Sequence, residues 1–432
     1  MCMSAFQLNT CARRNILELK PYRCARDDYK DDGTNVLLDA NENAYGPSLD
    51  LRNLESGLNT GHVGSKLDLN SLRLHRYPDP HQIELKGLLC NLRNTHHHTA
   101  KDIGPENLCV GVGSDEIIDA LLRCFCSPGR DKILICPPTY GMYPVNAQVN
   151  DVEVLSVPLD ASNGFGLRTA AINDALSNDS SVKIVFVCSP GNPNANLISK
   201  SDLQQILSHP TWNGVVVVDE AYIDFSPENS SLAEWVAEWP NLVVMQTLSK
   251  AFGLAGIRLG AAFTSPPIAF LLNNLKAPYN ISSITSALAC EVLQPHNVEV
   301  MKQNRKKIIE QQERLLIELP KIPRIGNFVG GRDANFLLVE ILDKPKQEGG
   351  QVSNETALAV YERLAETKGM VVRFRGNEPG CLGCLRITVG TKEEVDRLLE
   401  KLQEALQEVS ECSRANRDRE ERKESKASEV IA

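Results

Sequence analysis

Short runs of apolar, β-branched residues recur along the chain between about residues 108 and 264. They lie at Lys132–Cys136, Val152–Val157, Lys183–Cys188, Val215–Val218 and Leu242–Gln246. Each run is continuously apolar rather than alternating, and the intervals leave room for helices, which is typical of a parallel sheet buried on both faces. We therefore predict a large α/β domain with a mostly parallel central sheet over residues 78–305.

Beyond Pro278 the pattern changes to that of helices. Met301, Ile308 and Leu315 recur every seven residues in a charged segment, which predicts a long helix that ends before Pro320. Strand-like runs at 336–340 and 385–389 then alternate with helical stripes, so we predict a smaller α+β domain over residues 306–412. The stripes consist of Leu358, Tyr361 and Leu364, and of Val395, Leu398, Leu399, Leu402, Leu406 and Val409.

The two ends of the chain differ from these domains. Residues 1–77 are predicted to pack on the smaller domain. Residues 413–432 are mostly charged and contain no aromatic side chain, so they cannot bury enough apolar area to offset the entropy of ordering. We therefore predict a disordered charged tail at residues 413–432.

The composition favours small-molecule chemistry in a reducing compartment. The chain has 46 Lys and Arg against 55 Asp and Glu, and its net charge of −9 argues against binding to nucleic acid or anionic membranes. The 13 cysteines show no zinc-site spacing, and no apolar run reaches the ~18 residues that span a bilayer. The N-terminus lacks a secretory signal, although Arg13 and Arg14 before the first acid, Glu18, leave a short organelle-targeting peptide open.

A lysine follows the last of the predicted parallel strands. Lys250 comes after Thr247 and Ser249, and Arg258 follows at the end of a glycine-containing segment. A partly desolvated lysine amine forms Schiff bases with aldehydes, while hydroxyl groups and an arginine fork can hold a phosphate. The alternative is an ordinary exposed lysine at a strand end.

An acid follows the valine strand Val215–Val218. Asp219 falls at the carboxyl edge of the predicted sheet, where open α/β sheets bind ligands, and it could keep a pyridinium nitrogen protonated. Tyr222 could then reach the phenolic oxygen of the same ring. A helix N-cap is the alternative role for Asp219.

Other predicted strand ends carry polar or aromatic residues. Asn192 could donate to the same ring oxygen, and Ser114 and Asp115 stand where a glycine turn opens a helix, which suits a phosphate. Tyr140 could stack on an aromatic cofactor. Each residue alone could belong to a turn or the core, but all fall at one edge of the sheet, which favours a single cofactor site.

Two further motifs are interpreted as structural. The run His96-His97-His98 lies in a polar stretch, so solvated side chains are favoured over a metal site. Cys381 and Cys384 have the spacing of a redox pair but lead into a strand rather than a helix, so we expect no disulfide chemistry. No metal is predicted.

Taken together, these motifs resemble the fold-type I pyridoxal-phosphate aminotransferases and, within them, the histidinol-phosphate aminotransferase family. The resemblance extends from about Ala12 to Val409, and its histidinol-phosphate marker is the string Leu-Arg-Ile-Thr-Val-Gly-Thr at 385–391 with Arg373 thirteen residues before Arg386. At 194–195 the chain has Asn-Ala where the family usually has Thr-Gly. Further markers are 38–47, 76–79, 113–116, 218–225 and 247–258.

The resemblance implies a role for each residue around the cofactor ring. Lys250 would form the covalent imine with pyridoxal 5'-phosphate and shuttle the proton, and Asp219 would bind the pyridine nitrogen. Asn192 and Tyr222 would contact the ring oxygen, and Tyr140 would stack on the ring.

The resemblance also implies which residues hold the two anionic groups. The cofactor phosphate would be held by Ser114, Asp115, Thr247, Ser249 and Arg258, together with Tyr77 from the second subunit of a dimer. The substrate would be held by Tyr22, Arg373 and Arg386.

The implied protein is a cytoplasmic homodimer in which residues 1–77 also pack on the partner subunit. It would transfer an amino group between L-histidinol phosphate or imidazole acetol phosphate and 2-oxoglutarate or L-glutamate, by a ping-pong mechanism in histidine biosynthesis. Three alternatives remain: an aromatic-amino-acid aminotransferase, a threonine-phosphate decarboxylase of the same fold, and a catalytically silent scaffold.

Overall fold

The computed structural model describes residues 7–20, 27, 29, 33–49 and 72–431, with the backbone alone for 413–431. The chain forms two compact units: the first is Met1–Arg23, Glu42–Lys306 and Gly330–Ala334, and the second is Cys24–Asn41, Lys307–Val329 and Asn335–Ala432. The division after Lys306 lies one residue from the predicted one.

Most of the N-terminal segment belongs to the first unit, whereas we expected it on the smaller domain. Of residues 1–77, which we expected on the smaller domain, only 24–41 belong to the second unit. The reason is visible after residue 42, because the Asn43 side-chain amide donates to the carbonyl of Ala251 over 2.9 Å and the Ser48 N–H donates to that of Phe252 over 2.9 Å. These hydrogen bonds tie the segment to the loop that follows Lys250.

The first unit is built on a seven-stranded sheet in the order β2-β8-β7-β6-β5-β3-β4. Its strands are β2 (Leu108–Val112), β3 (Lys132–Ile135), β4 (Glu153–Ser156), β5 (Val182–Cys188), β6 (Val215–Asp219), β7 (Leu242–Thr247) and β8 (Leu259–Thr264). Strands β7, β6, β5, β3 and β4 pair in parallel, and only β8 of this sheet runs antiparallel to its neighbours. The predicted mostly parallel sheet is confirmed.

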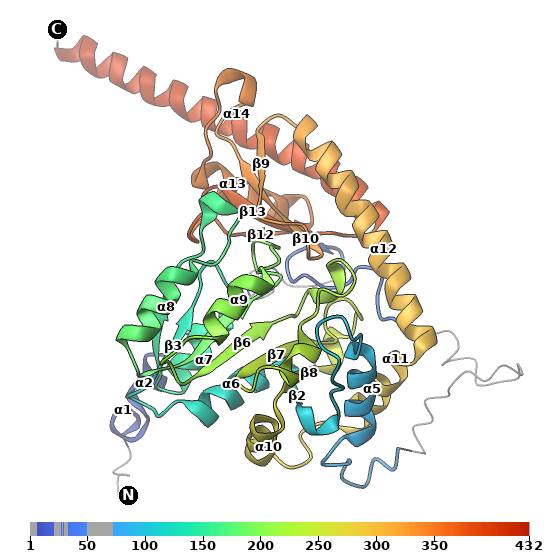
Figure 1. Cartoon of the computed structure of the whole chain (residues 1–432). Coiled ribbons are helices and arrows are strands. Elements are labelled where there is room, and N and C mark those ends of the chain that lie inside the picture. The colour runs from blue at the N-terminus through green and yellow to red at the C-terminus, as the bar shows by residue number, and fades with distance from the viewer. Residues whose placement is uncertain (1–6, 21–26, 28, 30–32, 50–71, 432) are drawn as a thin grey trace, which may run out of the picture. The chain divides into compact units, whose positions relative to one another are not determined.

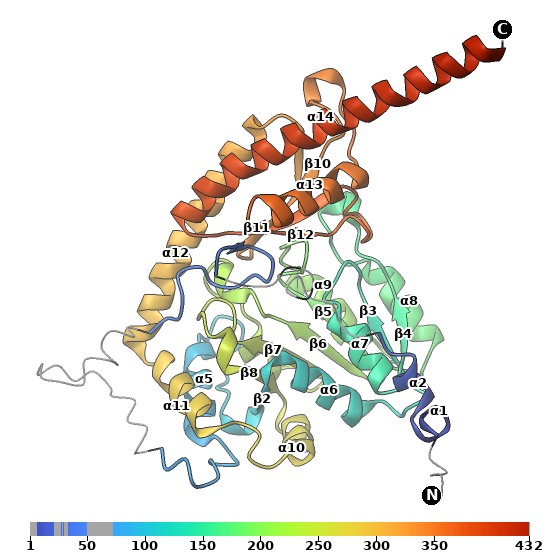
Figure 2. The same cartoon turned by 180° about the vertical axis from the view of Figure 1, so that it is seen from behind.

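Helices lie on both faces of this sheet, as Figures 1 and 2 show from opposite sides. In β6, Val217 faces one layer of side chains and Val216 and Val218 face the other, yet all three are fully buried. This explains why the strand is continuously apolar. The helices of the unit are α1 (Leu8–Cys11), α2 (Arg14–Leu17), α5 (Ile83–Arg93), α6 (Gly113–Phe125), α7 (Met142–Val149), α8 (Thr169–Asn178), α9 (Lys200–Leu207), α10 (Pro266–Leu275) and α11 (Ser283–Val292).

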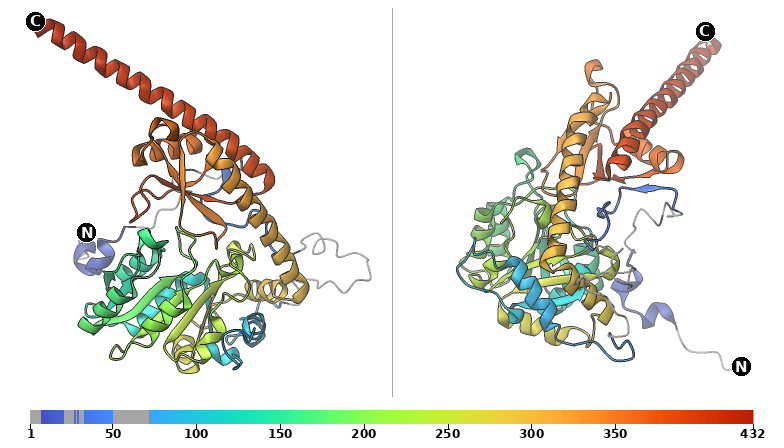
Figure 3. Two further views of the ribbon diagram at one scale, coloured as in Figure 1. Left: turned by 45° about the horizontal axis from the view of Figure 1, so that its top comes forward. Right: turned by 90° about the vertical axis from the view of Figure 1, so that its right-hand side faces the viewer.

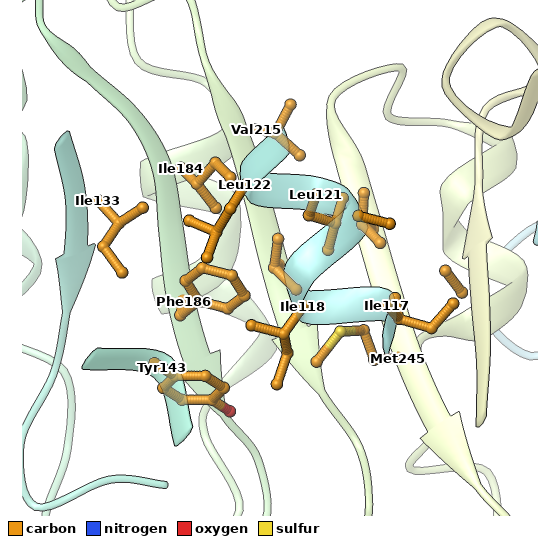
Figure 4. Close-up of a cluster of buried hydrophobic side chains, with 14 of the residues drawn as sticks. Ile117, Ile118, Leu121, Leu122, Ile133, Tyr143, Ile184, Phe186, Val215 and Met245 are labelled. Carbon is orange, nitrogen blue, oxygen red and sulfur yellow. The ribbon is translucent and has the colours of Figure 1, made fainter. Parts of the chain in front are cut away.

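Helix α6 forms the centre of one core layer (Figure 4). Its stripe of Ile117, Ile118, Leu121 and Leu122 packs against side chains from the strands, and Tyr143 of α7 joins the same cluster. This packing fixes α6 so that its first turn lies directly after the end of β2.

The second unit contains a four-stranded antiparallel sheet in the order β12-β13-β10-β9 (Figure 3). The strands are β9 (Ile325–Val329), β10 (Phe336–Ile341), β12 (Arg373–Phe374) and β13 (Cys384–Thr388), while β1 (Val36–Leu37) pairs separately with β11 (Met370–Val371). The helices are α13 (Asn354–Thr367) and α14 (Lys392–Ile431), and α12 (Pro295–Glu318) crosses the division. The predicted stripe of Met301, Ile308 and Leu315 in α12 is buried.

Helix α14 continues to Ile431, where we had predicted disorder from residue 413. The segment contains no glycine or proline and is rich in Glu, Lys, Arg and Ala, which favour helix even where no apolar face is available. The apolar stripe of α14 ends at Val409. None of the described helices is long and apolar enough to cross a membrane.

We predict that ending the chain after Cys412 leaves its stability nearly unchanged. Residues 413–432 are mostly charged, and Val409 is the last buried apolar residue in the part of α14 whose side chains are described, so the melting temperature should fall by no more than about 2 °C. As a comparison within the same helix, Leu402→Ala should cost about 2–5 kcal/mol, because Leu402 is fully buried. A truncated protein as unstable as Leu402→Ala would contradict this reading of the helix.

Candidate active site

Asp219 is the last residue of β6 and is only 2% exposed. Its carboxylate accepts a hydrogen bond from the Tyr143 hydroxyl over 2.7 Å and one from the Ala221 N–H over 3.2 Å. Burial raises the pKa of Asp219 to about 6, although these hydrogen bonds and the nearby Lys250 act in the opposite direction. A buried carboxylate of this kind is stabilised by a cation placed against it.

Lys250 lies beyond the end of β7, close to Tyr222. The Lys250 Nζ is 5.8 Å from the centroid of the Tyr222 ring, and its charge acts on the Asp219 carboxylate. Tyr222 is itself buried. The structure therefore brings together the amine, the phenol and the carboxylate that the sequence predicted for one site.

The hydroxyl groups before Lys250 form a local hydrogen-bond cluster. The Thr247 hydroxyl lies 2.9 Å from the Leu259 carbonyl and 2.9 Å from the Ser249 hydroxyl, and it accepts from the Ser249 N–H over 3.1 Å. These bonds join the end of β7 to the start of β8. They hold two of the predicted phosphate ligands next to the strand that follows Arg258.

Arg258 reaches the first turn of α6. Its Nη2 lies 3.6 Å from an Asp115 carboxylate oxygen, and a Cβ added at Gly113 would be 2.4 Å from the same nitrogen. A Cβ at Gly260 would be 2.6 Å from the backbone nitrogen of Ser114, so glycine is required for β8 to approach α6 this closely. Backbone N–H groups, a helix N-terminus and a guanidinium converge here, an arrangement that binds phosphate.

Tyr140 connects the two halves of the site. Its hydroxyl donates to Asp115 over 3.2 Å, and its ring meets that of Tyr143 edge to face with 5.6 Å between centroids. Contacts therefore run from Arg258 through Asp115 and Tyr140 to the partner of Asp219. Asn192, another predicted ligand, is buried in the loop after β5.

The contacts described so far do not involve the remaining predicted residues. Tyr77 is 80% exposed and stacks on Tyr279, with 4.6 Å between ring centroids. Arg373 and Arg386 belong to the sheet of the second unit. Tyr22 lies outside the described residues.

Our sequence analysis missed Tyr143. It packs face to face on Phe186, with 4.7 Å between ring centroids, while its hydroxyl reaches Asp219. Tyr140 precedes α7, which begins at Met142, so the three-residue spacing of the two tyrosines was no helical signal for this contact. An aromatic residue within an apolar helix gave no reason to expect a polar contact.

The two motifs that we interpret as structural consist of histidines near the surface and of buried thiols. His96 and His97 are exposed, and the His98 Nε2 lies 2.9 Å from the Asn229 carbonyl. Cys381 and Cys384 are buried free thiols. Within the described part of the chain, no group of three or more His, Cys, Asp or Glu residues could hold a metal ion.

The donor set of the first unit fits an aromatic aldehyde that carries a phosphate. A buried acid suits a protonated ring nitrogen, an amine suits the aldehyde, and the Arg258 cradle suits the phosphate. Residues 35–402 match the family model "Aminotransferase class I and II". The chain therefore belongs to the class I and II aminotransferases.

Several individual relatives of the chain are histidinol-phosphate aminotransferases. The chain is 53% identical to the histidinol-phosphate aminotransferase of Schizosaccharomyces pombe over 93% of this chain and 98% of that protein. It is 46% identical to that of Saccharomyces cerevisiae over 94% and 99%. The solved histidinol-phosphate aminotransferase of Sinorhizobium meliloti, in complex with pyridoxal-5'-phosphate, shares the fold with a TM-score of 0.75 at 20% identity, over 94% of this chain and 99% of that one.

The raised pKa of Asp219 predicts a pH-dependent stability in the cofactor-free protein. Between about pH 4 and pH 6 the folded chain holds a proton at Asp219 that the unfolded chain has lost, so stability falls as pH rises through this window. Asp219→Asn has no ionisable group at this position, so it should not lose stability as the pH rises. The variant should be more stable than the unchanged protein by about 1–3 kcal/mol at pH 8, and the difference should vanish near pH 4.

Melting temperatures measured across this range would check the prediction. Tyr143→Phe removes a hydrogen bond that lowers the pKa of Asp219, so the loss of stability should extend to higher pH. The exposed Asp174→Asn serves as the matched control. If Asp219→Asn is no more stable than the unchanged protein at pH 8, the ionised Asp219 carboxylate does not destabilise the fold.

Proposed function

We propose that this aminotransferase exchanges amino groups between L-histidinol phosphate and 2-oxoglutarate, and between L-glutamate and imidazole acetol phosphate, in histidine biosynthesis. The main support is the placement of Asp219, Lys250 and Arg258 at one edge of the sheet. In addition, the chain is 53% identical to a histidinol-phosphate aminotransferase over 98% of that relative's length. Pyridoxal 5'-phosphate is the cofactor, and when bound it supplies an aldehyde and an electron-accepting ring. Two substrates that use one site in turn give ping-pong kinetics.

The residues around the cofactor ring divide the chemical work. Lys250 holds the aldehyde carbon through its amine and moves the proton at the substrate α-carbon. Asp219 keeps a proton on the ring nitrogen, and Asn192 and Tyr222 bind the ring oxygen. Tyr140 stacks on the ring. The phosphate is bound by Ser114, Asp115, Thr247, Ser249 and Arg258.

Arginines bind the anionic groups of the substrates. Arg373 and Arg386 supply the bidentate guanidinium forks that suit a phosphate as well as a carboxylate, which is what an enzyme with these two substrates requires. Tyr22 is the third substrate residue in the proposal.

The active enzyme is a homodimer in which Tyr77 binds the cofactor phosphate of the partner subunit. In support, Tyr77 is 80% exposed, although a tyrosine ring is largely apolar and is normally covered. Further apolar side chains are exposed on the first unit, at Ile83, Val112, Tyr279 and Ile284. The cysteines that the structure describes are free thiols, which supports a cytoplasmic location.

Absorbance spectroscopy tests the activity. Purified protein should be yellow, and added L-histidinol phosphate should convert the chromophore, with recovery on addition of 2-oxoglutarate. Borohydride reduction should attach the cofactor to the peptide that contains Lys250, an attachment absent in Lys250→Ala and retained in the control Lys302→Ala.

Other outcomes select the alternatives. Conversion only by aromatic amino acids indicates an aromatic-amino-acid aminotransferase, and release of carbon dioxide from threonine phosphate indicates the decarboxylase. A colourless protein that takes up no added cofactor indicates a catalytically silent scaffold.

Mixed dimers test the shared site. Tyr77→Phe and Lys250→Ala should each lower activity strongly, whereas a mixed dimer should contain one site in which neither residue is changed. Activity should therefore reappear when the two variants are dissociated and reassembled together. Mixed dimers that form without recovering activity would place Tyr77 and Lys250 of one site on the same subunit.

A further inference from the structure

Two arginines of the second unit face each other across a pair of strands. Arg373 of β12 is the direct partner of Arg386 in β13 in the antiparallel register. Directly opposed residues lie on one face of the sheet, and like charges in that position repel. Arg386 is also buried, so little water screens the repulsion.

A carboxylate lies within the field of this pair. The Glu378 Oε1 is 2.8 Å from the side-chain Nε of Arg375. The backbone N–H of Arg375 donates to the Cys384 carbonyl over 2.9 Å, which extends the pairing of β12 with β13. Burial raises the pKa of Glu378 despite the opposing attraction of Arg375, Arg386 and Arg373. Glu378 is thus paired with Arg375, and the charges of Arg373 and Arg386 also attract its carboxylate.

The other carboxylate oxygen of Glu378 has a different environment. Within the described part of the chain, Oε2 is buried and accepts no hydrogen bond. The same residues border a hollow of about 330 Å³ whose charged lining includes Arg373, Arg375 and Glu378, with Leu358, Tyr361 and Phe374 as its apolar wall. Charge and open space thus meet at Arg373, one of the two proposed substrate arginines.

We infer that Glu378 is a built-in counter-ion of the Arg373–Arg386 pair, and that Glu378 and Arg375 set how strongly this site binds a dianionic group such as a phosphate monoester. The inference rests on the proposed function in assigning Arg373 and Arg386 to the substrate. Glu378 is a positioning and specificity-determining residue. Its negative charge weakens the pull of the arginines on any anion, so that each substrate anion can also leave during the alternation of two substrates.

A purely structural ion pair leads to a different expectation. If Glu378 and Arg375 only clamp the turn between β12 and β13, removal of either partner disorders the same turn and weakens anion binding. A counter-ion gives effects of opposite sign, because Glu378→Gln removes a negative charge while Arg375→Gln removes a positive one. The sign therefore distinguishes the two roles.

Sulfate is a suitable probe for the experiment. It remains a dianion from pH 6 to 9 and does not react, and in the holoenzyme the cofactor already fills its own phosphate site. Sulfate dissociation constants would be measured by equilibrium dialysis at several sodium chloride concentrations. The variants are Glu378→Gln, Arg375→Gln and the double variant, with the exposed Glu362→Gln of α13 as control.

Opposite shifts are expected. Glu378→Gln should bind sulfate about three- to tenfold more tightly, with a steeper salt dependence, and Arg375→Gln about three- to tenfold more weakly. The double variant should stay within about twofold of the unchanged protein, as should Glu362→Gln. If Glu378→Gln does not fold, the double variant still distinguishes the two roles. A structural clamp predicts weak sulfate binding by the double variant, whereas a counter-ion predicts nearly unchanged binding.

Weaker binding in both single variants, or no change in Glu378→Gln, would overturn the inference. The readout is independent of turnover. Opposite shifts in a protein that does not convert L-histidinol phosphate would retain the counter-ion and reject the proposed substrate. Conversion of L-histidinol phosphate together with shifts of equal sign would retain the proposed substrate and reject the counter-ion.

Discussion

Burying the Asp219 carboxylate at the end of β6 costs free energy, because the charge loses its hydration among protein atoms. Hydrogen bonds from Tyr143 and Ala221 offset part of that cost, yet the pKa remains raised to about 6. Two neighbouring elements supply the compensating groups. Helix α7 positions the Tyr143 hydroxyl at the strand end, and the loop after β7 positions the Lys250 amine nearby. In the function that we propose, a protonated ring nitrogen held against Asp219 would complete the compensation.

The neighbouring acid, Glu220, shows how differently the chain treats a structural carboxylate. It accepts hydrogen bonds of 2.7 Å from the Ser231 hydroxyl, the Leu232 N–H and the Gln246 amide, and Gln246 in turn accepts from Arg93. Its partners come from the chain itself, although burial still raises its pKa to about 7. Two adjacent acids at the end of β6 thus differ in role: Glu220, just beyond the strand, holds the following loop through hydrogen bonds, whereas we propose that Asp219, the last strand residue, pairs with the cofactor.

The sequence predicted the parts of the fold and site that depend on local pattern. Apolar runs located the sheet, and the residues after them, including Asp219 and Lys250, do meet at one edge because parallel strands end on the same side. Tyr143 could not be found this way, because its polar contact depends on how α7 packs over β6. Nor could the opposition of Arg373 and Arg386 be read from their spacing, since register depends on the turn between the strands. For residues 413–431, helix propensity outweighed the absence of an apolar stripe in the sequence.

The two anion sites that we propose for this chain differ in how they are built. The Arg258 cradle combines a guanidinium with backbone N–H groups, and the close approach of Gly260 to Ser114 leaves its backbone little room for adjustment. Such rigidity suits a phosphate that stays in place through every turnover, because no ordering entropy is lost again at each cycle. A site that exchanges a phosphate monoester for a dicarboxylate must fit two geometries, and long arginine side chains provide that freedom. Their attraction then has to be limited as well as directed, and a nearby carboxylate such as Glu378 limits it without blocking the space that the substrate needs.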